Sequence, residues 1–81
     1  MDQQTIFTEV KSIFSRIIND AVEVKPETTS RDVVSWDSLN HVMFIAEVEK
    51  VFSIRFDLAD MLEMQSIAAI CKGVEAKLKL K

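Results

Sequence analysis

The chain has 81 residues, 48% of them hydrophobic, with one glycine, one proline and no tyrosine. This length allows one small domain with a single core, and the composition favours helices over a turn-rich β fold. Its net charge of −3 argues against nucleic-acid binding.

The first predicted helix covers residues 4–19, because apolar residues recur there at spacings of three and four. The apolar stripe consists of Ile6, Val10, Ile13, Phe14, Ile17 and Ile18. A long connection over residues 20–36 follows, in which Pro26 interrupts any helix. We expect this connection to pack on the core through its valines, which are Val22, Val24, Val33 and Val34.

The second helix is predicted to begin at Ser38, with Asp37 as its N-cap. We expect its inward face to consist of Leu39, Val42, Met43 and Ala46, with Ile45 as a further candidate. Residues 52–56 alternate apolar and polar side chains, so this segment is predicted to be extended.

Asp57 is expected to cap a short helix over residues 58–62. A last helix, capped by Ser66, carries apolar residues at helical spacing. These residues are Ile67, Ile70, Cys71, Val74 and Leu78. Gly73 lies inside this helix and costs about 1 kcal/mol relative to alanine, for a reason that the sequence does not provide.

Cys71 is the only cysteine, so no internal disulfide is possible and a reducing compartment is adequate. No apolar run exceeds five residues, which argues against a membrane-spanning helix. The first residues have neither the positive charge nor the apolar stretch of a signal peptide. We therefore expect a cytoplasmic monomer that does not bind membranes.

Ser38 is the most informative side chain, because a helix N-terminus exposes unpaired N–H groups and the positive end of the helix dipole. Such a place suits an attached or bound phosphate. The sequence around it is Trp-Asp-Ser-Leu over residues 36–39, followed by an amphipathic helix and the phenylalanine-rich segment 52–56. These features together resemble the acyl carrier protein family, and the resemblance covers essentially the whole chain.

The resemblance implies an all-α carrier domain over residues 1–81, with three long helices, one short helix and a long first loop. It implies that Ser38 carries 4′-phosphopantetheine as a phosphodiester, within a motif that includes Asp37 and Leu39. A separate phosphopantetheinyl transferase attaches this group from coenzyme A, and Asp37 helps to hold the Mg²⁺ of that enzyme. The chain itself then binds no metal and is not an enzyme.

By the same resemblance, the thiol of the attached arm forms a thioester with an acyl or aminoacyl group. The chain would present this cargo to loading and transferring enzymes in fatty-acid, polyketide or related specialised biosynthesis. The alternative is an unmodified helical interaction module with a carrier-like fold, since Asp37 and Ser38 are also ordinary helix-start residues.

Two residues depart from the family pattern. Asn40 stands where many relatives have an acidic residue, and Trp36 stands where many fatty-acid carriers have a small one. We expect Trp36 to fold over the helix start near His41, to pack the loop on the core, or to grip a partner. His41 is expected to be exposed, with the phosphate or a partner as candidate contacts.

The charge distribution predicts an acidic partner surface. Residues 37–63 hold six acids and two bases, whereas residues 72–81 hold four lysines and one glutamate. The predicted partner-binding acids are Glu47, Glu49, Asp57, Asp60 and Glu63. In the family such acids meet basic patches on partner enzymes; the alternative is an ordinary solvated face. Steering by these charges would make binding sensitive to salt.

Three methionines have two possible roles. Met43, Met61 and Met64 are expected either to line an adaptable pocket for the acyl chain or to fill the core.

Overall fold

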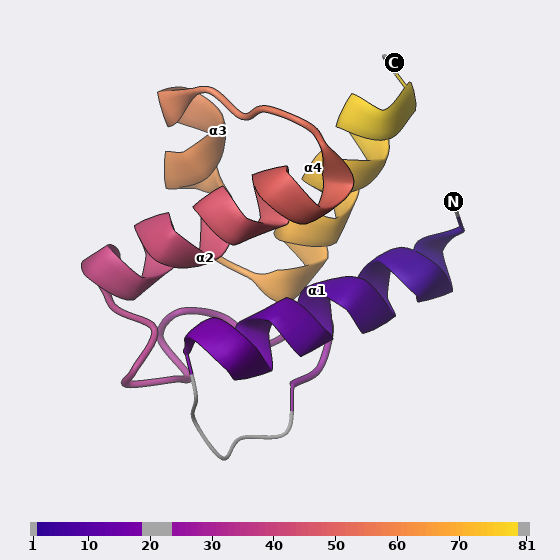
Figure 1. Ribbon diagram of the computed structural model, residues 1–81. Helices are drawn as coiled ribbons and strands as arrows, with labels where there is room; N and C mark the ends of the chain where they lie inside the picture. The colour runs from indigo at the N-terminus through magenta and orange to yellow at the C-terminus, as the bar shows by residue number, and fades with distance from the viewer. Residues whose placement is uncertain (1, 19–23, 80–81) are drawn as a thin grey trace.

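The computed structural model describes residues 2–18 and 24–79, which form four helices (Figure 1). They are α1 (Gln3–Ile17), α2 (Ser38–Phe52), α3 (Leu58–Glu63) and α4 (Ile67–Lys79). The number, order and relative lengths of the helices agree with the sequence-based prediction. Residue 19, predicted to end the first helix, and Val22, predicted to pack on the core, lie outside the described residues.

The core is built around α1, which packs against both α2 and α4. The predicted stripes on α1 and α4 are confirmed, with Ile17, Cys71 and Leu78 half-buried at the edge of the core. The fully buried residues of these two helices are Ile6, Val10, Ile13, Phe14, Ile67, Ile70 and Val74.

The predicted inward face of α2 is wrong except for Ile45, the further candidate, which is fully buried. The buried residues of α2 are His41, Phe44, Ile45, Val48 and Phe52. Leu39, Val42 and Met43 are 70%, 51% and 48% exposed, and Ala46 is also exposed. Both sets follow the helical spacing i, i+3, i+4, i+7 and differ by two residues, which is about 200° around a helix. The apolar surface of α2 continues around most of the helix, so spacing alone did not identify the buried side.

The connection before α2 packs on the core, as predicted, and is tied to the start of α4. Val24 and Val33 are buried, although Val34 is 95% exposed and the prediction for it was wrong. The Ile67 N–H donates to the Thr28 carbonyl at 2.9 Å. Further bonds of 2.8 and 2.9 Å join Ala68 N–H to Pro26 O and Ser30 N–H to Gln65 O. The loop carbonyls therefore satisfy N–H groups at the beginning of α4.

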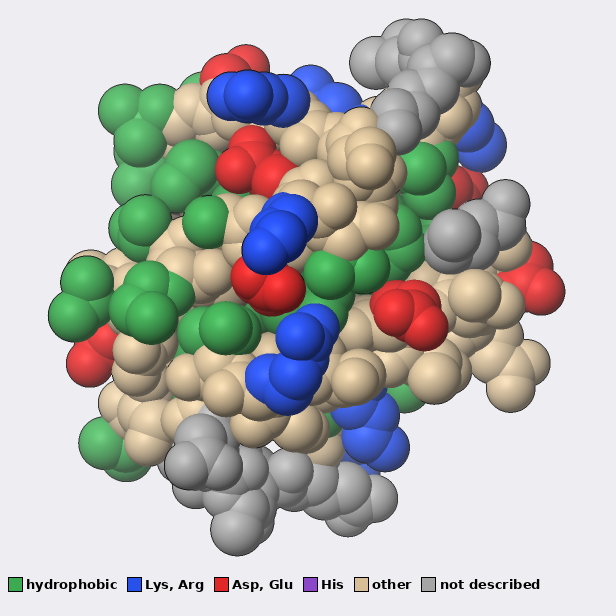
Figure 2. Space-filling model, viewed as in Figure 1, with side chains coloured by type: hydrophobic (Ala, Val, Ile, Leu, Met, Phe, Trp, Pro, Cys, Tyr) green, Lys and Arg blue, Asp and Glu red, His purple; other side chains and the backbone are tan. Residues whose placement is uncertain are grey.

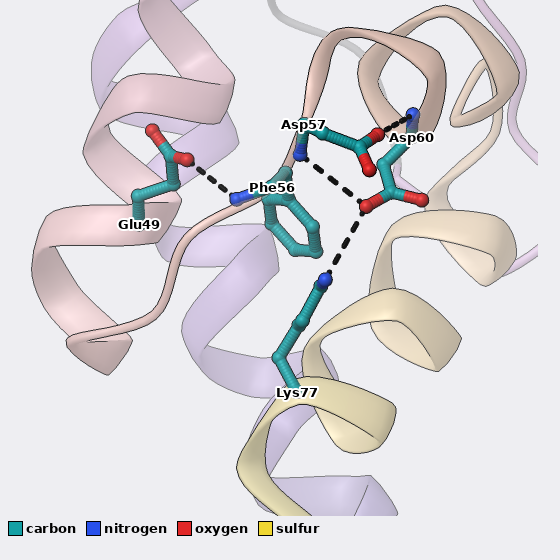
Figure 3. Close-up of polar contacts among 5 residues, drawn as sticks. All are labelled: Glu49, Phe56, Asp57, Asp60 and Lys77. Atoms are coloured by element: carbon teal, nitrogen blue, oxygen red, sulfur yellow. Dashed lines mark hydrogen bonds and ion pairs between the residues drawn. The ribbon is translucent and has the colours of Figure 1, made fainter. Parts of the chain in front are cut away.

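Side-chain carboxylates hold the end of the segment between α2 and α3 that leads into α3 (Figure 3). Ser53 ends α2 in the left-handed region with φ of 55°, so the predicted extended segment begins only after it. The Phe56 N–H then donates to the Glu49 carboxylate at 2.7 Å.

The predicted cap of α3 is confirmed. Asp57 accepts from the Asp60 N–H at 2.8 Å, and Asp60 accepts from the Asp57 N–H at 3.3 Å. This reciprocal pair is a capping box, and it satisfies two donors at the start of α3. Ser66 accepts from the Ala69 N–H at 3.1 Å, as expected for the cap of α4.

Gly73 has a packing reason. A Cβ atom at this position would lie 2.8 Å from the sulfur of Met64 and 3.2 Å from a ring carbon of Phe56. Both neighbours are buried, so they would have to move to admit a methyl group. The close approach of α4 to these two side chains thus explains a glycine inside a helix.

We expect Gly73→Ala to lower the free energy of unfolding by about 1 kcal/mol, because overpacking outweighs the gain in helix propensity. Urea unfolding measures this change. The exposed Ala76 provides the control: Ala76→Gly removes helix propensity without touching the core. A Gly73→Ala protein more stable than the wild type would contradict the packing explanation.

Candidate functional site

Ser38 is exposed as the first residue of α2, a helix of 15 residues. The Asp37 side chain accepts from the Asn40 N–H at 2.9 Å, which confirms the predicted N-cap. The Asn40 side chain donates to the Ser35 carbonyl at 2.7 Å and so joins the loop to the first turn. The serine is therefore presented to solvent at the positive end of a well-capped helix.

Trp36 is buried just before this cap, with 3% of its surface exposed. Its ring lies 5.2 Å from that of Phe14 and 5.9 Å from that of Phe44, both edge to face. Such pairs contribute beyond simple area burial. The expectation that Trp36 packs the loop on the core is confirmed. Little of the indole surface is left for the direct grip on a partner that we also considered.

The expectation that His41 is exposed was wrong, since only 8% of its surface is exposed. The Trp36 indole N–H donates to His41 Nδ1 at 2.9 Å, and His41 Nε2 lies 2.9 Å from the Met61 carbonyl oxygen. An indole N–H only donates and a carbonyl only accepts, so these partners place the imidazole hydrogen on Nε2. The neutral ring thus joins the loop, α2 and α3, an arrangement that we call the imidazole link.

The imidazole link also shows what sequence reasoning missed about His41. Both ring nitrogens have partners inside the protein, so neither is directed to a phosphate on Ser38. The sequence offered only a partial signal: His41 shares helical spacing with Phe44, Ile45 and Val48, which is one of the two sets on α2 that spacing allows as the buried side.

A groove of about 370 Å³ lies beside Ser38. Its walls come from the loop, α2 and α3 and include Trp36, Ser38, His41, Val42, Met61 and Leu62. Of the three methionines considered, Met61 lines the groove, Met64 is buried in the core and Met43 is exposed. A pocket thus adjoins the serine, with one methionine in it.

Exposed apolar side chains surround the groove. We call them the apolar face; they are Leu39, Val42 and Met43 of α2 with Leu58 and Leu62 of α3. Figure 2 shows hydrophobic side chains gathered on the left of the molecule, over the beginning of α2 and over α3. Exposed apolar patches of this kind mark interaction sites.

Four of the five acids predicted to bind partners have contacts within the chain, and the fifth, Glu63, is exposed at the end of α3. Glu47 lies 3.6 Å from Arg16 of α1, while Glu49 accepts from the backbone of Phe56. Asp57 and Asp60 form the capping box, and Lys77 of α4 lies 3.4 Å from the Asp60 carboxylate (Figure 3). The contacts of Glu49, Asp57 and Asp60 hold α3 and the segment before it in place, whereas that of Glu47 joins α2 to α1.

Cys71 is half-buried and packs against the core, as predicted. Burial raises the pKa of its thiol to about 11 from the ordinary 9.0. The thiolate is the nucleophilic form of cysteine, so at neutral pH this side chain is nearly inert.

At pH 8 we expect Cys71 of the folded protein to react with iodoacetamide about tenfold more slowly than in the urea-unfolded protein. The raised pKa reduces the thiolate population, and the greater nucleophilicity of a more basic thiolate offsets part of the loss. Mass spectrometry of timed samples gives both rates, and the folded rate should rise as the pH approaches 11. Equal rates in the two states would contradict the raised pKa.

Across residues 2–18 and 24–79, no group of three potential metal ligands comes together. In the same ranges no helix is long and apolar enough to cross a bilayer.

Comparisons with known proteins agree with this geometry. Residues 8–74 match the family model described as the phosphopantetheine attachment site. An acyl carrier protein of Thermotoga maritima is 31% identical over 77 residues, which cover 94% of this chain and 95% of the relative. The solution structure of a holo acyl carrier protein from Geobacter metallireducens is similar, with a TM-score of 0.83 and 25% identity. That match covers 93% of this chain and 87% of the other.

Proposed function

We propose, since the chain belongs to the acyl carrier protein family, that Ser38 is the residue to which 4′-phosphopantetheine is attached. Members of this family are carriers and not enzymes, and phosphopantetheine is their covalently bound prosthetic group. The observation that supports Ser38 most strongly is its exposure at the N-terminus of α2, inside the matched residues.

The surroundings of Ser38 fit such a group. The N–H groups of the first turn and the dipole of α2 favour the negative charge of a phosphodiester. Val42, Met61 and Leu62 offer apolar contacts in the adjoining groove. The attached group supplies a thiol that forms a thioester with an acyl group, while the chain supplies a rigid and accessible attachment point.

Asp37 and Leu39 complete the attachment motif in this proposal. Asp37 is exposed and caps α2, and we propose that its second carboxylate oxygen helps to hold the Mg²⁺ of the transferase. Leu39 is 70% exposed beside Ser38, where a modifying enzyme can contact it.

Ser38→Ala is expected to abolish modification without changing the fold, because only the acceptor oxygen is removed. Incubation with coenzyme A, Mg²⁺ and a phosphopantetheinyl transferase should add the mass of one phosphopantetheine to the wild type and none to the variant. Ser35→Ala, three residues earlier, is the matched control and should be modified like the wild type. Circular dichroism checks that each variant is folded.

Addition of the group to Ser38→Ala would remove Ser38 as the attachment site. A wild type that no transferase modifies would instead favour the unmodified interaction module.

The proposed partners follow from this role. They are a phosphopantetheinyl transferase and the enzymes that load and remove the acyl or aminoacyl cargo. We place the carrier in fatty-acid, polyketide or related specialised biosynthesis, as a cytoplasmic monomer whose single domain comprises the whole chain. Support for the domain comes from the acyl carrier protein relative, which aligns with 94% of the chain.

We propose that partner enzymes contact the apolar face around Ser38. An enzyme that reaches an arm on Ser38 must also cover its nearest exposed neighbours, which include Leu39 and Val42. The acids predicted from sequence keep a part in this proposal. Because Glu47, Glu49 and Asp60 have internal partners, they act on a partner through their long-range field rather than as free ion-pairing groups.

Val42→Asp is expected to lower kcat/KM of the transferase about tenfold, because it places a charge in the apolar contact; a factor of ten corresponds to about 1.4 kcal/mol. Val51→Asp is the control, since Val51 is an exposed valine of the same helix more than three turns from Ser38. Equal effects of the two substitutions would refute the proposed face. Measurement of kcat/KM at increasing salt concentration separates steering by the acids, which salt weakens, from apolar contact.

A further inference from the structure

We propose that the imidazole link closes the seam between α2 and α3 and thereby restricts this carrier to short acyl groups, held in the groove outside the core. In this proposal His41 is a specificity-determining residue. The inference rests on the proposed attachment at Ser38, because only an arm fixed there delivers its cargo to this groove.

The inner end of the groove is polar. The side chains of Trp36 and His41 line the groove, and their hydrogen bond runs between two buried residues. The second bond of the ring, to the Met61 carbonyl, joins α2 directly to α3. A chain entering between these helices has to break this bond first.

Broken bonds in the imidazole link cannot be replaced by an acyl chain. Separation of α2 from α3 would leave the imidazole N–H and the Met61 carbonyl without their partners. A methylene group neither donates nor accepts, so the polar atoms would stay unsatisfied in a buried place.

The side chains behind the imidazole link already fill the space into which a long chain would pass. Phe14, Phe44 and Ile45 are fully buried. The rings of Phe14 and Phe44 lie 5.5 Å apart, edge to face, and both contact Trp36. In a core packed to this extent, an added chain must displace side chains from their places.

The groove walls nevertheless give a short acyl group an apolar contact. Val42, Leu58 and Leu62 line the groove and are exposed. A short acyl group that covers these side chains removes apolar surface from water without opening the seam. A long chain would extend past these side chains into solvent and gain little more.

The test compares cargo lengths on the intact protein. A transferase loads the wild type with acetyl-, hexanoyl- or decanoyl-phosphopantetheine from the corresponding coenzyme A thioesters, and intact mass confirms each product. We expect the thermal midpoints of the acetyl and decanoyl forms to agree within about 3 °C, since a cargo held outside the core adds little stability. The NMR signals of Phe14 and Phe44 should also be the same in the two forms.

His41→Leu replaces the imidazole with an apolar side chain of suitable size and removes both hydrogen bonds, so the seam can open. In this variant the decanoyl form should melt at least about 5 °C above the acetyl form. Thr28→Val is the matched control: Thr28 is buried and accepts from the Lys25 N–H at 2.9 Å, but it does not line the groove. This control should melt lower than the wild type and show no dependence on cargo length.

The outcomes distinguish the two proposals. Failure of every loading reaction overturns the attachment at Ser38 and, with it, this inference. Successful loading with a higher midpoint for the decanoyl wild type, or with shifted Phe14 and Phe44 signals, overturns only the restriction to short cargo. If His41→Leu does not fold, these wild-type measurements still decide the question.

Discussion

Burial of the Trp36 indole just before the first turn of α2 is the contact on which the candidate site depends. The ring packs against Phe14 and Phe44, so it joins α1, the loop and α2 in one aromatic cluster. One residue separates Trp36 from Ser38 in the chain. A tryptophan fixed in the core therefore determines where α2 begins and leaves the serine outside. Its N–H also positions His41, which continues the connection to α3.

The acids around α3 stabilise the fold, and we propose that the same residues also take part in partner recognition. Asp57, Asp60 and Glu49 satisfy backbone donors that the short segment between α2 and α3 would otherwise expose. One oxygen of each carboxylate accepts a backbone hydrogen bond, and in the proposed function the charge of these acids contributes to the field that a partner meets. In the same proposal direct contact falls to the apolar face, where Leu39 and Leu58 are 70% and 69% exposed. In this proposal the acids supply long-range attraction and the apolar face supplies the docking contact.

The local features of the fold were predictable because they depend on residues three or four apart. Asp37 and Asp57 cap α2 and α3 through bonds to the N–H three residues later, and such caps can be read from a short stretch of sequence. The position of Ser38 at the start of α2 was predictable for the same reason. The family resemblance depended on these same residues, and the comparisons confirm the family.

The sequence by itself determined the helices, their caps and the place of the serine, whereas the tertiary structure decided which side of α2 is buried. Two apolar sets on α2 satisfy the same spacing. The set that contains Phe44 is buried because it packs against Phe14, which lies in α1, and Trp36, which lies in the loop before α2. The burial of His41 follows from that selection, because its ring needs Trp36 on one side and Met61 on the other. Gly73 is explained in the same way, by Met64 and Phe56. Spacing along one helix carries no information about such distant partners.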